Sequence, residues 1–296
     1  MIPFTKAHAC GNDFLIVAED DLAGHDPSSL AIALCDRNTG IGADGVEYFS
    51  WQNQDAALGP LSARIRLFNA DGSLAEISGN GTRCVAAWMA HEASAQPGDE
   101  LTLTTDAGPR FSKLVELRTS GSPTALITTN MDTPDWEPRL VELSDGSRLD
   151  GISVSMGNPH FVLLVSNPPL PDGSLDFSLD GRPWQEIGEE ICFHPDFPEQ
   201  TNVEFIQRLA SPRNQPDQVA LRIFERGVGP THSSGTGTSA AATAMIAAFG
   251  SSSTIEIFAP GGMQSVHWPG DSSPLLLTGP ATLIARGEAW LATTNG

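Results

Sequence analysis

The chain has 296 residues, 40% of them hydrophobic, and a formal net charge of −20 from 36 acidic and 16 basic side chains. Its length suits one large compact unit or two smaller ones, because a single core stops growing at roughly 250 to 300 residues. The acidic excess would repel phosphate backbones and anionic lipid headgroups, so we expect neither nucleic acid nor a membrane surface as a partner.

Segments rich in β-branched and aromatic residues predict strands, and two alanine-rich segments predict helices. In chain order we expect strands at 46–49, 63–69, 101–105, 125–129, 151–156, 161–165, 220–224 and 281–291, and helices at 82–93 and 238–249. The two helices are expected to be the apolar centres of two halves. Turn-forming residues between 131 and 150 predict the boundary between these halves.

The chain repeats itself once, in a single order. The matches, first half to second, are 11–12 with 157–158, 46–48 with 203–205, 66–69 with 222–225, and 78–82 with 234–238. The last two matches share one offset of 156 residues, and the others differ from it by no more than loop insertions would produce. The sequence therefore predicts two halves of the same topology.

Signals for targeting, metals and pyridoxal phosphate are weak. The first 21 residues lack a secretory pattern and the most apolar segment, 240–249, is too short to span a bilayer, so we expect a soluble, cytoplasmic protein. The four cysteines are scattered and the seven histidines show no metal-ligand spacing, which favours reduced thiols and no metal site. The two lysines, Lys6 and Lys113, lie outside any phosphate-binding setting, which argues against pyridoxal phosphate.

Both repeats of Ser-Gly-x-Gly place a serine, Ser78 or Ser234, directly before an expected helix. A helix N-terminus can hold a carboxylate through its free N–H groups and dipole, so the pair could grip one anion. Each serine alone could equally be an ordinary N-cap. His160 and His232 are candidates for acid-base work or for a structural role. The motif at 40–45 (GIGADG) matches a dinucleotide fingerprint by letter, but a strand is expected after it instead of a helix.

Taken together, these residues resemble the diaminopimelate epimerase family. The matching segments are 11–14 (GNDF), 36–37 (DR) with 40–45, 68–73 (FNADGS) with 75–76 (AE), 79–84 (GNGTRC), 157–160 (GNPH), 194–195 (HP) with 197–198 (FP), 201–205 (TNVEF), and 225–229 (ERGVG) with 235–237 (GTG). They occur in the family's order and extend over about residues 4–245.

The resemblance implies an α/β (α+β) fold of two pseudo-symmetric domains, each a sheet wrapped round a central helix, with the active site between them. Its last strand would return to the first domain, so the implied domains are 1–130 with 278–296, and 131–277.

The family inverts an amino-acid α-carbon without a cofactor: one residue removes the α-proton and another delivers a proton from the opposite face. By resemblance these residues are Ser78 and Ser234, with His160 near the first and Glu225 near the second as relay partners. The implied substrate-binding residues are Asn12, Asn69, Gly79, Asn80, Asn158, Asn202, Glu225, Arg226, Gly235 and Thr236. Arg226 would hold the distal carboxylate of an amino dicarboxylate substrate.

The sequence departs from the family at the reacting positions, where the family usually has two cysteines. A serine hydroxyl is a far weaker acid than a thiol and needs a strong neighbouring base. The leading interpretation is an epimerase that converts LL- to meso-diaminopimelate with two serines. A related isomerase of altered chemistry, a silent binding homologue, and a chain in which both cysteines were deliberately changed remain open, as does a homodimer.

Overall fold

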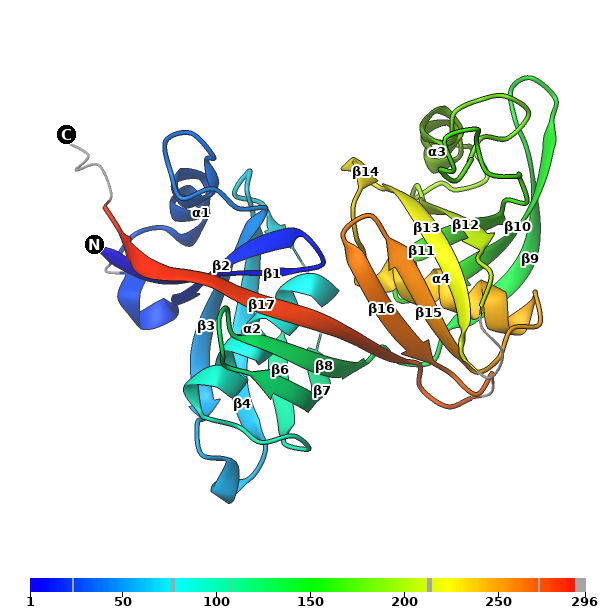
Figure 1. The fold of residues 1–296 in the computed structure, drawn as a ribbon. Coiled ribbons are helices and arrows are strands. Elements are labelled where there is room, and N and C mark those ends of the chain that lie inside the picture. The colour runs from blue at the N-terminus through cyan, green and yellow to red at the C-terminus, as the bar shows by residue number, and fades with distance from the viewer. Residues whose placement is uncertain (23, 76–77, 107, 212–214, 271, 291–296) are drawn as a thin grey trace. The chain divides into compact units, whose positions relative to one another are not determined.

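A computed structural model describes the chain except residues 23, 76–77, 107, 212–214, 271 and 291–296. Glu76 of the family motif and the expected end of the last strand, residue 291, lie outside the described residues. The chain divides into two compact units, Met1–Thr129 with Thr278–Gly296 and Asn130–Leu277 (Figure 1).

The first unit is a sheet that closes round one helix. Its elements are β1 (Ile2–Ala9), β2 (Asn12–Ala18), α1 (Pro27–Cys35), β3 (Gly45–Asn53), β4 (Leu61–Asn69), β5 (Leu74–Ala75), α2 (Gly79–Glu92), β6 (Glu100–Thr105), β7 (Gly108–Arg118), β8 (Thr124–Asn130) and β17 (Leu276–Ala289), with short 3-10 turns at Glu19–Leu22 and Ala56–Leu58. Pairing runs β1-β2-β3-β4-β6-β7-β8-β17 and back to β1, and β5 adds to β4. The last strand thus joins the first unit, as the resemblance implied.

The second unit repeats this order of pairing. Its elements are β9 (Asp135–Glu142), β10 (Arg148–Ser155), β11 (Pro159–Leu164), α3 (Trp184–Cys192), β12 (Asn202–Arg208), β13 (Asp217–Glu225), β14 (Gly229–Thr231), α4 (Gly235–Ala247), β15 (Thr254–Ala259) and β16 (Gly262–His267). Its strands pair β9-β10-β11-β12-β13-β15-β16, with β14 on β13. The β2–β3 and β11–β12 pairs are parallel, and the β3–β4 and β12–β13 pairs are antiparallel.

The alanine-rich helices α2 and α4 are the centres of their units. Nearly every residue from Asn80 to Ala90 and from Gly237 to Met245 is buried, because small side chains let the strands approach on all sides. Both helices begin three residues before the expected start, since the glycines that follow each serine cap already belong to the first turn. Each of the two helices therefore supplies a large part of one buried apolar cluster of its unit.

The two units divide at Thr129/Asn130, beside the start of the expected boundary at 131–150, and most of that segment is a hairpin of the second unit. Residues 135–142 form β9, which pairs with β10 from Asp135↔Ser155 to Glu142↔Arg148, and the turn formers Ser144 to Gly146 close this hairpin. The same residue types that mark linkers also mark hairpin turns, so composition could not separate the two.

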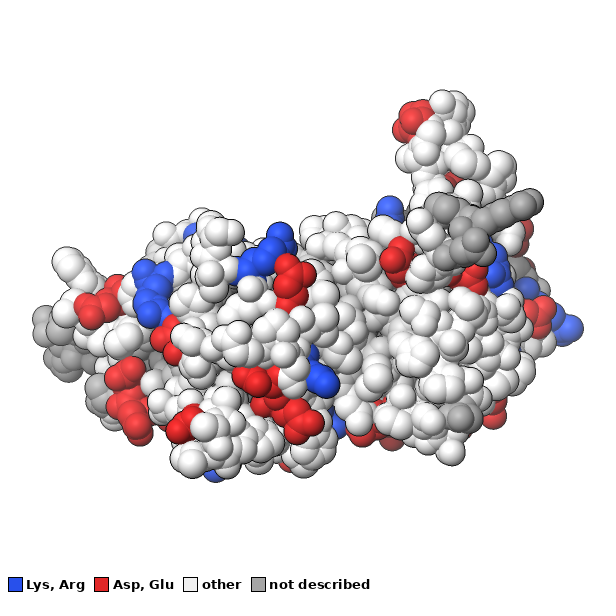
Figure 2. Space-filling view, turned by 60° about the horizontal axis from the view of Figure 1, so that its bottom comes forward, with Lys and Arg blue, Asp and Glu red and all other residues white. Residues whose placement is uncertain are grey.

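Basic side chains on the face shown in Figure 2 are few and lie among acidic ones. Ion pairs of this kind include Arg148 with Glu142 and Arg182 with Glu190. In the described ranges, no helix is both long enough and apolar enough to cross a membrane.

Candidate active site

Ser78 caps helix α2 of the first unit. Its backbone is extended (φ −124°, ψ 123°), and its Oγ accepts a hydrogen bond from the Gly81 N–H at 3.1 Å. The Thr82 hydroxyl donates to the Ser78 carbonyl at 2.8 Å and closes the first turn. The hydroxyl of Ser78 therefore lies in the positive field of the helix end, which favours negative charge on that oxygen or on an anion beside it.

Ser234 caps helix α4 of the second unit in the same way. Its backbone is extended (φ −142°, ψ 132°), and its Oγ accepts from the Gly237 N–H at 3.2 Å. The Thr236 hydroxyl lies 3.4 Å from the same oxygen. Both serines are N-caps, so the structural role holds for each, and the duplication gives each unit one hydroxyl at an equivalent helix end.

A buried glutamate lies under each of these helix ends. A Cβ added to Gly81 would lie 2.1 Å from Glu47 Oε1 and 3.3 Å from the Ser78 Cβ. A Cβ added to Gly237 would lie 2.8 Å from Glu204 Oε1 and 3.2 Å from the Ser234 Cβ. The glycine at the third helical position is thus required for space, and it brings carboxyl and serine together in both units.

Strand register shows that the two glutamates are equivalent. Glu47 on β3 faces Leu67 on β4, and Glu204 on β12 faces Ile223 on β13. The positions Leu67 and Ile223 are 156 residues apart, which is the offset of the serines. Sequence comparison of the halves had aligned both glutamates, but no chemical role was predicted for either.

The partner of Glu204 is His160. The imidazole is 1% exposed, its Nδ1 lies 2.8 Å from Glu204 Oε1, and its Nε2 lies 3.0 Å from Asn158 Oδ1. Burial raises the pKa of Glu204, although the charge and hydrogen bond of His160 partly offset the rise. Both ring nitrogens are therefore engaged in a fixed Asn158–His160–Glu204 chain.

Glu225 ends β13 in the same unit. Burial and the neighbouring charge of Glu204 raise the pKa of Glu225 to about 7, while His160 acts in the opposite direction. A carboxyl with this pKa is suited to give and take protons near neutrality. In the described part of the chain no hydrogen bond joins Glu225 to Ser234, and the charges that act on Glu225 are those of Glu204 and His160. The predicted Ser234–Glu225 relay stays a prediction. The predicted Ser78–His160 pair joins residues of different units and stays a prediction.

Two of the three candidate asparagines of the first unit, Asn12 and Asn80, are linked to each other. The Asn80 amide donates to Asn12 Oδ1 at 3.1 Å, and the Asn12 amide donates to Asp44 Oδ2 at 2.6 Å. Asp44 in turn accepts from Arg37 at 2.8 Å, and the Asn69 amide donates to the Ser73 hydroxyl at 3.0 Å. The motif at 40–45 leads into β3, not a helix, and its Asp44 orients Asn12.

In the second unit, Asn202 is bound at both ends of its amide. Its Nδ2 donates to the Pro159 carbonyl at 2.9 Å, and its Oδ1 accepts from the Arg226 backbone N–H at 2.9 Å. The exposed Arg226 side chain donates to the Glu199 carbonyl at 2.9 Å. Asn202 thus fixes the loop that carries Arg226, whose guanidinium keeps further donors for a ligand.

The cysteines offer no replacement for the serines. All four are buried, and burial raises the pKa of Cys84 and Cys192 and raises that of Cys35 to about 12. Among the described residues, no group of three or more histidine, cysteine, aspartate or glutamate side chains is placed to hold a metal ion. The groups that lie at the two helix ends are the serine hydroxyls and the glutamate carboxyls, with His160 bonded to Glu204.

Glu47 gives a prediction for stability. Burial raises the pKa of its carboxyl to about 8, so the folded protein keeps the proton that the unfolded chain, with a pKa near 4.5, gives up. Stability is therefore highest, with respect to this group, below pH 4.5 and is lost as pH rises towards about 8. We expect Glu47→Gln to remove a few kcal/mol of this loss, since one pKa unit corresponds to about 1.4 kcal/mol.

The measurement is urea unfolding of both proteins at pH 5 and pH 9. Wild-type stability should fall relative to Glu47→Gln between these values, and a constant difference would contradict the assignment. Glu116→Gln, at an exposed position on β7, is the matched control and should leave the pH dependence unchanged.

Comparison with solved structures identifies the fold. A phenazine biosynthesis protein of the PhzF family from Bacillus anthracis superposes with a TM-score of 0.66 at 15% identity, covering 98% of this chain and 99% of that one. A probable proline racemase from Agrobacterium radiobacter gives a TM-score of 0.63 at 14% identity over 100% and 94% of the two chains. A hydroxyproline epimerase from Agrobacterium vitis gives 0.60 at 15% identity over 97% and 92%. These matches confirm the expected two-domain fold.

Comparison of sequences defines the family. The sequence pattern of the diaminopimelate epimerase family matches residues 4–136 and 152–284, one stretch in each half. The diaminopimelate epimerase of Pseudomonas aeruginosa is 32% identical over 98% of this chain and 100% of its own length. That of Microcystis aeruginosa is 33% identical over 97% of this chain and 98% of its own. The chain belongs to the diaminopimelate epimerase family and is a pyridoxal-phosphate-independent isomerase of the epimerase and racemase class.

Proposed function

We propose that the protein interconverts LL- and meso-diaminopimelate by moving a proton at one α-carbon, with Ser78 and Ser234 as the two acid-base positions. The observation that carries this proposal is the duplicated helix end, with a capping serine and a buried glutamate in each unit. Family membership over the whole chain supports the reaction class, and the names of the sequence relatives support the substrate. These findings do not favour a catalytically inactive homologue that only binds the substrate.

The chemistry needs stabilisation of the carbanion that forms when the α-proton leaves. Its charge spreads onto the adjacent carboxylate, which the first-turn N–H groups at Gly79, Asn80, Gly235 and Thr236 would bind. A preorganised helix end stabilises such developing charge without reorganisation in the transition state. The family reaction requires no electron sink beyond this, which is consistent with a chain whose two lysines lie outside any phosphate-binding setting.

In the second unit, Glu204, His160 and Glu225 would supply the strong base that Ser234 needs. Glu204 lies beside Ser234 across Gly237, and Glu225 lies within electrostatic reach of Glu204. A carboxyl group that changes its protonation near neutral pH can take the serine proton as the serine takes the α-proton. Glu225 would thus keep its predicted role as the relay partner of Ser234, but its effect on Ser234 would be transmitted through Glu204.

Four asparagines and one arginine would bind the far end of the substrate, where a diamino dicarboxylate carries its second amine and carboxylate. They are Asn12, Asn69, Asn158, Asn202 and Arg226. The guanidinium of Arg226 can meet a carboxylate with two parallel hydrogen bonds. Asn12, held by Asp44 and Asn80, presents a fixed amide. Arg226 would therefore favour a substrate that carries a second carboxylate over a monocarboxylate.

We expect Arg226→Ala to raise KM for diaminopimelate by about 10- to 100-fold with a smaller change in kcat, because the lost contact is remote from the reacting carbon. Steady-state kinetics from both isomers measures the effect. Arg118→Ala removes an exposed arginine of β7 and is the matched control, with KM unchanged. An unaltered KM in Arg226→Ala would contradict the assignment.

The proposed function is tested by incubating the purified protein with LL-diaminopimelate and separating the stereoisomers by chiral chromatography. The meso isomer should appear, and the meso isomer as starting material should give the LL form. Proline, 4-hydroxyproline and glutamate, tested in parallel, should remain unchanged. If the protein inverts one of these amino acids and not diaminopimelate, it is an epimerase, but the proposed substrate is wrong.

A further inference from the structure

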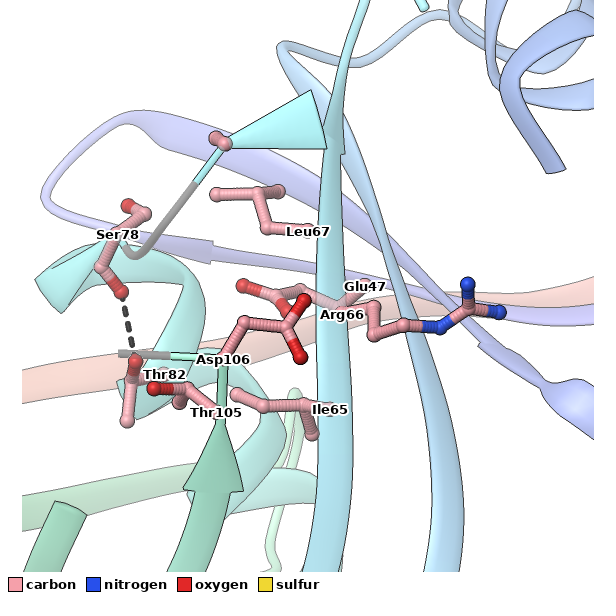
Figure 3. A pocket seen from close by; sticks show the side chains of 9 residues that line it. Glu47, Ile65, Arg66, Leu67, Ser78, Thr82, Thr105 and Asp106 are labelled. Atoms are coloured by element: carbon pink, nitrogen blue, oxygen red, sulfur yellow. Dashed lines mark hydrogen bonds between the residues drawn. The ribbon is translucent and has the colours of Figure 1, made fainter. Parts of the chain in front are cut away.

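The carboxyl group of Glu47 is buried in the first unit, and no other described residue forms a hydrogen bond with it. Glu47 is 1% exposed, and both Oε1 and Oε2 lack a partner among the described residues. The carboxyl lines a small pocket together with Ser78, Thr82 and Asp106 (Figure 3). The guanidinium of Arg66 also belongs to this pocket but points away and pairs with Glu19 at 2.7 Å.

The missing partner has a clear cause in the repeat. His160 pairs in register with Asn202 on β12, and the equivalent pair in the first unit is Phe14 with Gly45. A phenyl ring therefore stands where the second unit has the imidazole that binds Glu204. The first unit therefore has the carboxyl of Glu47 but has a phenylalanine in place of the histidine that binds Glu204.

An unpaired buried carboxyl is unfavourable for folding. Leaving a buried polar group without a hydrogen bond destabilises a protein by roughly 1 to 3 kcal/mol, and an apolar side chain at this strand position would avoid this loss. Glu47 lies between the buried Val46 and Tyr48, on a strand that is otherwise apolar there. Such groups gather at functional sites, where their proton is used.

The geometry around Gly81 connects this proton to Ser78. Glu47 Oε1 and the Ser78 Cβ lie on the same side of the Gly81 α-carbon. A Cβ added to Gly81 would be 2.1 Å from the first atom and 3.3 Å from the second. The Ser78 Oγ at present accepts the Gly81 N–H, and rotation of the hydroxymethyl group or one bridging water would link it to the carboxyl. Catalytic contacts of this kind often tighten only when substrate is bound.

This inference rests on the proposed function. We propose that Glu47 is the proton reservoir of the first unit and acts on the substrate through Ser78. In one direction the Ser78 O–H proton goes to the α-carbanion while the Glu47 O–H proton replaces it on Ser78, leaving a Glu47 carboxylate. In the other direction the α C–H bond breaks, its electron pair stays on carbon, the proton goes to Ser78 Oγ, and the serine proton goes to the carboxylate.

The electrostatic surroundings suit this role. Burial raises the pKa of Glu47 to about 8, so the carboxyl holds its proton at neutral pH and can release it in the working range. Among the described residues, the other titratable groups near it are Cys84 of α2, whose own pKa is raised by burial and by Glu47, and Asp106 after β6. Arg66 of β4 is neutralised by Glu19.

Deuterium exchange in D₂O separates the two units, since each isomer presents its α-proton to only one of them. In Glu47→Gln we expect one isomer to lose α-exchange by at least about 10-fold while the other still exchanges without inverting, because the second unit still works. KM should change little, and the limb of the pH–rate profile near pH 8 should disappear. Glu204→Gln, at the equivalent position, should show the opposite isomer preference.

Glu47→Asp, which restores a carboxyl one methylene shorter, should recover part of the lost exchange for the same isomer. This variant also serves if Glu47→Gln does not fold. Equal loss of exchange for both isomers, or wild-type exchange and pH profile in Glu47→Gln, overturns the relay. Absence of exchange of both isomers in the wild-type protein overturns the proposed function and the relay with it.

Discussion

Replacing Ser78 or Ser234 by alanine is expected to lower kcat for epimerisation by about 10²- to 10⁴-fold, the usual contribution of a positioned acid or base. Each hydroxyl caps its helix end, and a glutamate lies behind it in both units. Steady-state assays of both single variants, started from each isomer, measure the effect. Each variant should invert the substrate only at this reduced rate, while the intact unit still exchanges the α-proton of one isomer.

Loss of the cap must be separated from loss of chemistry. Removing an N-cap destabilises a protein by about 1 kcal/mol, so both serine variants will be somewhat less stable. Asp26→Ala removes a similar cap from α1, where Asp26 Oδ2 accepts from Ser29 at 2.9 Å, and is the matched control. If Asp26→Ala keeps full activity and Ser78→Ala does too, Ser78 is only a cap.

Replacing both serines by cysteine is expected to raise kcat by about 10-fold or more at neutral pH. A thiol has a pKa near 8.5 and is a much better acid and base than a hydroxyl, and a helix N-terminus lowers that pKa further. The scaffold otherwise matches its family over both halves. The Ser78→Cys, Ser234→Cys protein should also lose activity on treatment with iodoacetamide, whereas the wild-type protein, with four buried cysteines, should resist it.

The opposite result would also be informative. If the double cysteine variant folds, reacts with iodoacetamide at the new positions and has less activity than wild type, the serines perform chemistry that a thiol cannot replace. The two single cysteine variants show which unit is responsible.

Much of the fold could be predicted from the sequence because the two halves of the chain repeat the same motifs. The repeat around 66–69 and 222–225 predicted equal topology, and the alanine-rich segments predicted the two central helices. Hairpin turns between β9 and β10 could not be distinguished from a linker, since both use the same residues. Helix starts were misplaced because glycine has low helix propensity, yet the space beside Glu47 and Glu204 requires it.

The candidate site could be predicted from the sequence only in part. Both serine caps and the Asn12–Asn80 contact lie at positions that the sequence had singled out. Glu47 and Glu204 were missed, although a glutamate flanked by apolar residues inside a strand signals a buried carboxyl. His160 lies between Asn158 and Glu204 within its own unit, and its expected place near Ser78 of the other unit stays a prediction. Strand register, which the sequence does not reveal, decides these contacts.

Deuterium incorporation tests the central claim most directly, since it records proton transfer at the α-carbon whatever the final balance of isomers. The protein is incubated in D₂O with LL-diaminopimelate and, separately, with meso-diaminopimelate, and the products are analysed by mass spectrometry and chiral separation. The account predicts one deuterium at the inverted α-carbon together with interconversion of the two isomers. A folded protein that binds diaminopimelate but gives neither deuterium incorporation nor interconversion would contradict it.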